Sequence, residues 1–132
     1  MSKKESDLKN IRNDELEELI HHILTSPGEY IEDDDLKKLY FLLKKAKFIT
    51  PACGAGILRI TDTTGGISIP AFTSLNEYNI EFEGGQIKPI IIEYVKILLY
   101  LEDESLEGLF INPDGESFFI TRDMLFKALD AD

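Results

Sequence analysis

The sequence predicts an α+β domain in which two N-terminal helices precede a mixed or antiparallel sheet of about five strands, with helices packed on the sheet. Up to residue 46, apolar residues repeat at helical spacing. From residue 48 onward, short β-branched and aromatic runs alternate with turns that contain glycine or proline. Helices followed by strands with interspersed helices are typical of an α+β domain with one sheet.

Two amphipathic helices are expected between residues 13 and 47. Asn13 is a favourable cap for the first helix, and Ser26-Pro27-Gly28 ends it. Acidic residues lead both helices and lysines close the second, an order that complements the helix dipole. The apolar stripes are Leu16, Leu19, Ile20, Ile23 and Leu24 in the first helix, and Leu36, Leu39, Tyr40, Leu43 and Ala46 in the second.

Residues 1–12 are expected to form a flexible N-terminal tail. The segment is polar and mixed in charge, and Leu8 and Ile11 are its only large apolar residues after Met1. The folded domain is therefore expected to span residues 13–132, a length that suits one domain.

Short strands are expected over residues 48–51, 57–61 and 67–72, and the polar turn ending in Gly65-Gly66 joins the last two strands as a hairpin. Ser74-Leu75-Asn76-Glu77 fits the capping-box pattern, so a short helix is expected to begin there. Residues 87–100 suit either a strand or a helix. The favoured interpretation is a strand over residues 83–88 and then a helix to about residue 101.

Asn112-Pro113-Asp114-Gly115 has the preferred residues of a type I turn at its first, second and fourth positions. The runs over residues 108–111 and 117–120 are therefore expected to pair as a hairpin. Thr121 is expected to cap a last helix, whose apolar side carries Met124, Leu125 and Leu129.

The formal net charge of −11 disfavours binding to nucleic acids and to anionic membranes, because most of the surface repels phosphate. The chain has no apolar run near the roughly 20 residues that span a bilayer, and no N-terminal apolar segment. One cysteine, Cys53, leaves no internal disulfide and fits a reducing compartment. We therefore expect an acidic cytoplasmic protein.

Four stretches together resemble the N-terminal domain of the SseB family, the enhanced-serine-sensitivity proteins. They are Asn13-Asp14-Glu15-Leu16, the segment from Phe41 to Pro51, Pro70-Ala71-Phe72-Thr73-Ser74 with Glu77 behind it, and Gly108-Leu109-Phe110-Ile111-Asn112-Pro113. Their order and approximate spacing match over residues 13–129. The chain departs from the family pattern at Asp114, where an aromatic residue is common, and in having no tryptophan.

The resemblance implies an SseB-like α+β domain over residues 13–132, with a cytoplasmic location and no established catalytic activity. The family name refers to a serine-sensitivity phenotype that is loosely tied to sulfurtransferase metabolism.

Two motifs are candidate binding sites. Phe72, Thr73 and Ser74 precede the expected helix start, where a helix N-terminus favours anions, and Asn112, Pro113 and Glu116 belong to the hairpin turn. Each motif also has a structural interpretation, as a core residue with a helix cap and as a turn. A shared groove is expected only if both motifs lie at the same edge of the sheet.

No catalytic residues, metal site or cofactor are predicted. Cys53 has no histidine near it in sequence, and the adjacent His21 and His22 point about 100° apart on a helix, which is poor geometry for chelation. Residues 33–35 lack the spacing of a calcium loop, and no phosphate-binding glycine pattern is present.

The sequence thus favours a non-catalytic protein-binding or regulatory module whose acidic surface suits a basic protein partner. The alternative is a small-ligand binder or small enzyme that uses the helix start at Thr73-Ser74 as an anion site. A subunit that assembles only with itself is a third possibility, since the sequence does not determine the oligomeric state.

Overall fold

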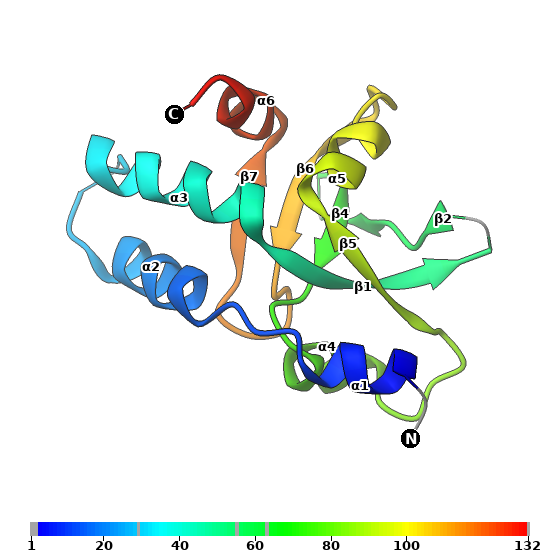
Figure 1. Cartoon of the computed structure of the whole chain (residues 1–132). Coiled ribbons are helices and arrows are strands. Elements are labelled where there is room, and N and C mark those ends of the chain that lie inside the picture. Colours follow the sequence, from blue (N-terminus) through cyan, green and yellow to red (C-terminus); the bar gives the residue numbers. More distant parts are fainter. Residues whose placement is uncertain (1–2, 29, 55, 63, 132) are drawn as a thin grey trace.

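The computed structural model describes residues 3–28, 30–54, 56–62 and 64–131 (Figure 1). The helices are α1 (Lys3–Lys9), α2 (Asp14–Thr25), α3 (Asp33–Lys45), α4 (Leu75–Phe82), α5 (Tyr94–Tyr100) and α6 (Arg122–Asp130). The strands are β1 (Lys47–Cys53), β2 (Gly56–Ile57), β3 (Ile60–Thr61), β4 (Ile67–Ala71), β5 (Pro89–Glu93), β6 (Leu106–Ile111) and β7 (Phe118–Thr121).

The strands form two linked sheets, and the prediction of an α+β fold is confirmed. One sheet has the order β2-β1-β5 and is antiparallel; the other has the order β3-β4-β6-β7, in which only β4 and β6 are parallel. An antiparallel bridge between Ile49 and Phe72 joins them through two backbone hydrogen bonds of 2.8 and 2.9 Å. The sequence predicted fewer strands and one sheet.

The main core lies between the inner face of the four-stranded sheet and the helices α2, α3, α5 and α6. Strands β4, β6 and β7 contribute Ile69, Leu109, Ile111 and Ile120, which are fully buried, and the helices contribute Leu39, Leu43, Ile97 and Leu125. This burial follows the expected alternation of strand side chains and the expected helical stripes. Two residues of the predicted stripes, Leu24 and Leu129, are instead exposed.

The expected flexible tail is wrong for the residues that the structure describes. Residues 3–9 form α1, and Leu8 and Ile11 are 6% and 7% exposed in a second apolar cluster with Phe72 and Tyr78. This cluster lies where α1 and α4 meet (Figure 1). Two well-spaced apolar residues therefore attach this segment, because they pack against apolar side chains of β1 and α4, such as Ile49 and Tyr78.

Two strand predictions also need correction. Residues 57–61 do not form one strand: Ile57 pairs with β1, whereas Ile60 and Thr61 pair with β4 in the other sheet. The expected strand at residues 83–88 is instead a turn, in which Gly84 has a φ of 75°. The strand begins at Pro89, because its β-branched residues pair with β1, as in the register Phe48↔Ile92.

The C-terminal predictions are confirmed. Strands β6 and β7 pair as an antiparallel hairpin, and the Gly115 N–H donates to the Asn112 carbonyl across the turn at 3.0 Å. The Thr121 hydroxyl accepts from the Met124 N–H at the start of α6. The helix at Ser74 is confirmed as well, with the Ser74 hydroxyl accepting from the Glu77 N–H.

Candidate functional site

The two candidate motifs lie side by side. Because β4 and β6 are parallel neighbours, their carboxyl ends meet at one edge of the sheet, where Phe72-Thr73-Ser74 and the turn after Ile111 begin. Helices α1 and α4 lie just beyond this edge (Figure 1). In open sheets with parallel strands, ligands are commonly bound outside the carboxyl ends of the strands.

Thr73 joins the two motifs through its hydrogen bonds. The Asn112 side chain accepts from the Thr73 N–H at 3.0 Å and donates to the Thr73 hydroxyl at 2.9 Å. The Asn13 amide donates to the Thr73 carbonyl at 2.8 Å and to the Lys47 carbonyl at 2.9 Å. Asn13 precedes α2 as expected, but its side chain makes no capping hydrogen bond and instead ties α2 to the strand ends.

Three of the six predicted binding residues are inaccessible to a partner. Phe72 is 1% exposed, Thr73 is fully buried and Asn112 is 5% exposed. Phe72 packs edge-on against Tyr78 and Phe82, with ring centroids 5.5 and 5.9 Å apart. These residues therefore build the edge of the sheet and do not form a contact surface.

The other three predicted residues reach the surface. Ser74 and Pro113 are half-buried, and Glu116 is exposed. A carboxylate oxygen of Glu116 lies 2.8 Å from Nδ1 of His21, which ties the hairpin turn to α2. The binding role of Ser74, Pro113 and Glu116 stays a prediction.

A cleft of about 550 Å³ opens beside this edge, between the segment around α1 and the N-terminus of α4. Ligand pockets commonly have volumes of roughly 300 to 1,000 Å³. The polar residues that line the cleft include Lys9, Arg12, Asp14, Glu17, Ser74 and Glu77. It therefore carries groups of both charges next to a helix start.

Two carboxylates of this cleft are held in an unusual environment. Burial raises the pKa of the Glu17 carboxyl; a hydrogen bond from Thr73 opposes this shift, and Glu77 and Asp14 add to it. The Oε2 atom of Glu77 is buried and has no hydrogen-bond partner among the described residues. It lies against Gly115, where an added Cβ would be only 2.5 Å from it.

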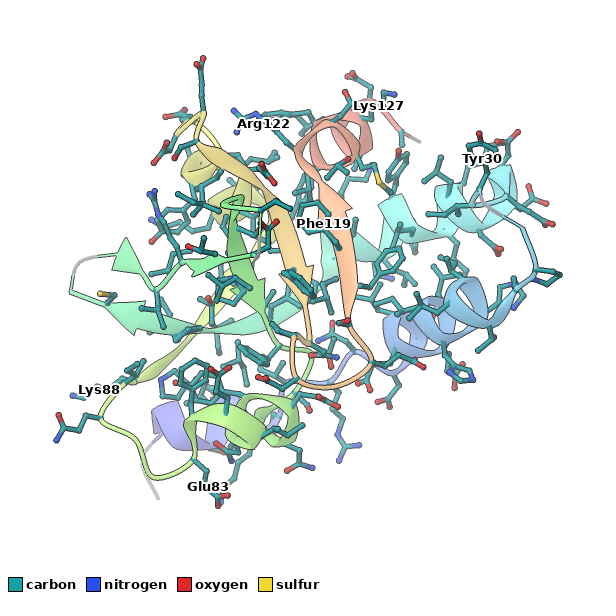
Figure 2. The ribbon with its side chains drawn as sticks, turned by 180° about the vertical axis from the view of Figure 1, so that it is seen from behind. Tyr30, Glu83, Lys88, Phe119, Arg122 and Lys127 are labelled. Atoms are coloured by element: carbon teal, nitrogen blue, oxygen red, sulfur yellow. The ribbon has the colours of Figure 1, made fainter. Side chains whose placement is uncertain are left out.

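The outer face of the four-stranded sheet is a second candidate surface. Figure 2 shows β4, β6 and β7 with no helix in front of them. The strand register places two rows of side chains on this face, Ile60, Ser68, Gly108 and Thr121 in one row and Pro70, Phe110 and Phe119 in the other. None of these seven residues is charged, and the rings of Phe110 and Phe119 lie 6.0 Å apart in an edge-to-face arrangement.

Sequence reasoning missed Glu17, Glu77 and the outer face as functional candidates. Glu77 appeared only in the capping box and in the family-like motif, and Glu17 is one of the acidic residues that lead the first helix. The alternation of Phe110 and Phe119 with buried neighbours was a usable signal for the outer face. The cleft had no comparable signal, because its walls come from segments about 60 residues apart.

Cys53 and the two histidines, His21 and His22, lie on different elements of the fold, β1 and α2. Cys53 is exposed at the end of β1. His22 lies 3.2 Å from a carboxylate oxygen of Asp35, and both histidines are on α2. Within the described residues, no group of three potential metal ligands comes together, and no helix is both long and apolar enough to cross a membrane.

The chain was also compared with known proteins. No protein-family model, curated protein or solved structure matches it, so the resemblance to the SseB family stays a prediction.

Proposed function

We propose that this chain is a non-catalytic protein-binding or regulatory module of SseB-like type that acts in the cytoplasm. The observation that carries the proposal is the outer face, defined above by its seven residues. Ser68, Pro70 and Gly108 of this face are buried, Ile60 and Phe110 are half-buried, and Phe119 and Thr121 are exposed. In a chain of which 30% of residues are charged, an uncharged patch of this kind favours a protein contact. Phe119, which is 38% exposed, is its most accessible aromatic residue.

Charge favours a basic partner. Exposed acids flank the outer face at both ends of β6: Glu107 lies before Gly108, and Asp114 and Glu116 follow in the hairpin turn. Together with the net charge of −11, this acidic rim attracts a positively charged protein and repels a second copy of the chain. An apolar centre with a charged rim is the usual arrangement of a protein interface.

The test is an affinity capture from the cells that express the protein, followed by titration of the purified partner. The double substitution Phe110→Ser and Phe119→Ser removes the aromatic centre of the outer face. The matched control, Val95→Ser and Leu99→Ser, removes apolar side chains on α5 that are 69% and 53% exposed. We expect the first variant to lose the partner and the control to retain it.

Two further results bear on the proposal. Binding to a basic partner weakens as ionic strength rises, because salt screens the acidic rim. A partner that both variants retain, or turnover of a substrate that depends on one polar residue, contradicts the proposal.

A second candidate function is small-ligand binding at the helix start after Thr73. The cleft beside Ser74 favours it, since it has the volume of a ligand site and lies outside the ends of two parallel strands. This function does not compete for the outer face, so one protein can combine both.

A further inference from the structure

The cleft contains charges of both signs that do not pair with one another. Its lining includes two cations, Lys9 and Arg12, and three acids, Asp14, Glu17 and Glu77. None of these five forms an ion pair within the part of the chain that the structure describes, whereas Lys47–Glu93, Arg59–Asp103 and Lys127–Asp123 do so elsewhere in that part. Opposite charges that share a cleft without pairing leave both available to a ligand.

One of these groups is under-satisfied. The Oε2 atom of Glu77 is buried without a hydrogen-bond partner among the described residues, which is costly for a carboxylate oxygen. Gly115 allows this position, because any side chain there collides with the Glu77 carboxylate. A cation bound in the cleft offsets part of this cost through its charge, without contacting the buried oxygen.

The acids do not suit a simple anion. Burial raises the pKa of the Glu17 carboxyl most, and the nearby negative charges of Glu77 and Asp14 add to this shift. An added phosphate increases this repulsion, even though Arg12 and the N-terminus of α4 attract it. An ammonium group relieves the repulsion, and a carboxylate on the same molecule satisfies the cations.

We propose that this cleft binds a small zwitterion, with its ammonium group facing Glu17 and Glu77 and its carboxylate facing Arg12, Lys9 and the N-terminus of α4. The inference rests on the second candidate function, small-ligand binding at the helix start after Thr73. It proposes a ligand that carries both a positive and a negative charge, in place of a simple anion. It is independent of the protein-binding role of the outer face.

The test is isothermal titration calorimetry of the full chain against two sets of probes. The zwitterions are glycine, β-alanine and 4-aminobutyrate, in which the distance between the charges increases. The single-charge probes are methylammonium, acetate and inorganic phosphate. We expect one zwitterion to bind at least tenfold more tightly than every single-charge probe, because it forms charged hydrogen bonds at both ends.

Variants locate the site. Glu17→Gln and Arg12→Gln each remove one charge from the cleft and are expected to weaken binding of the zwitterion about tenfold. Gly115→Ala is expected to weaken it too, by displacing the Glu77 carboxylate. Arg59→Gln is the control, since Arg59 pairs with Asp103 away from the cleft. Thermal unfolding of each variant confirms that it is folded.

The binding results distinguish a zwitterion site from a simple anion site in this cleft. Phosphate or acetate binding as tightly as the zwitterions supports an anion site and overturns the zwitterion. Binding that the cleft variants leave unchanged overturns this location. Failure of all six probes at millimolar concentration overturns the zwitterion proposal and removes the support for the second candidate function as well.

Discussion

Asn112 and Thr73 are held together by two hydrogen bonds, of 2.9 and 3.0 Å, although 39 residues separate them in the chain. Asn112 has a φ of 47°, the only positive φ of a non-glycine residue in the described chain. This left-handed conformation turns the chain out of β6 and aims the amide at Thr73. Asparagine suits the position, because it tolerates this conformation better than most residues and supplies both a donor and an acceptor.

The first prediction separates the two roles of Asn112, which are its left-handed backbone conformation and its side-chain hydrogen bonds to Thr73. Asn112→Gly keeps the conformation but leaves the buried Thr73 N–H without its partner, so we expect a loss of about 1–3 kcal/mol in the free energy of unfolding. Asn112→Ala adds the strain of a left-handed alanine, about 1 kcal/mol more. Urea denaturation measures both values. Equal stability of the two variants excludes a role for the backbone conformation.

The second prediction concerns the close approach of β6 and β7 at Gly108. A Cβ at this position collides with the backbone carbonyl of Ile120, which cannot move aside as a side chain can. We expect Gly108→Ala to lower the free energy of unfolding by about 1–3 kcal/mol. Gly56→Ala is the control, because its nearest neighbour, the Cys53 carbonyl, is 3.9 Å away. Thermal unfolding of both variants checks the difference.

The C-terminal half of the fold was predictable where short-range chemistry decides. Asn112, Pro113 and Gly115 specify a turn, and Ser74 and Thr121 are helix caps within a few residues of the backbone groups that they bind. The turn and the two helix caps are confirmed, because none of them depends on contacts with distant parts of the chain.

The sequence-based predictions are wrong where contacts between distant parts of the chain determine the local structure. The assignment of the β-branched run at Ile90 required knowledge of its partner strand β1, and Leu8 looked isolated until the cluster around Phe72 was known. The candidate site is similar: sequence reasoning identified both motifs but not their mutual burial. Which of them reaches solvent depends on the packing of α1 and α4, which no local pattern reports.

The third prediction compares two leucines for which sequence and structure disagree. Leu8 was expected in a flexible tail but is 6% exposed, whereas Leu129 was expected in the core but is 55% exposed. We expect Leu8→Ala to cost about 2 kcal/mol or more, and Leu129→Ala less than about 0.5 kcal/mol. Chemical denaturation measures both. The reverse order indicates that α1 detaches from the domain before it unfolds.

The fourth prediction uses the carboxyl of Glu17, whose pKa is raised by burial above its ordinary value of about 4.5 in the folded protein. The folded state therefore binds this proton more tightly than the unfolded state, so its contribution to stability decreases as pH rises from about 4.5 through the raised pKa. At pH 7 the charge of this half-buried carboxyl is a net cost, and Glu17→Gln removes it while its amide oxygen still accepts from Thr73. We expect Glu17→Gln to be more stable than the wild type at pH 7.

The advantage of Glu17→Gln is expected to disappear below about pH 4.5, where the carboxyl is protonated in both states. Thermal unfolding from pH 3.5 to 8 measures this convergence. Glu18→Gln is the control, because Glu18 lies on the same helix but is exposed and does not line the cleft. A constant difference between Glu17→Gln and the wild type at every pH contradicts the proposed cause, since an effect of packing alone does not titrate.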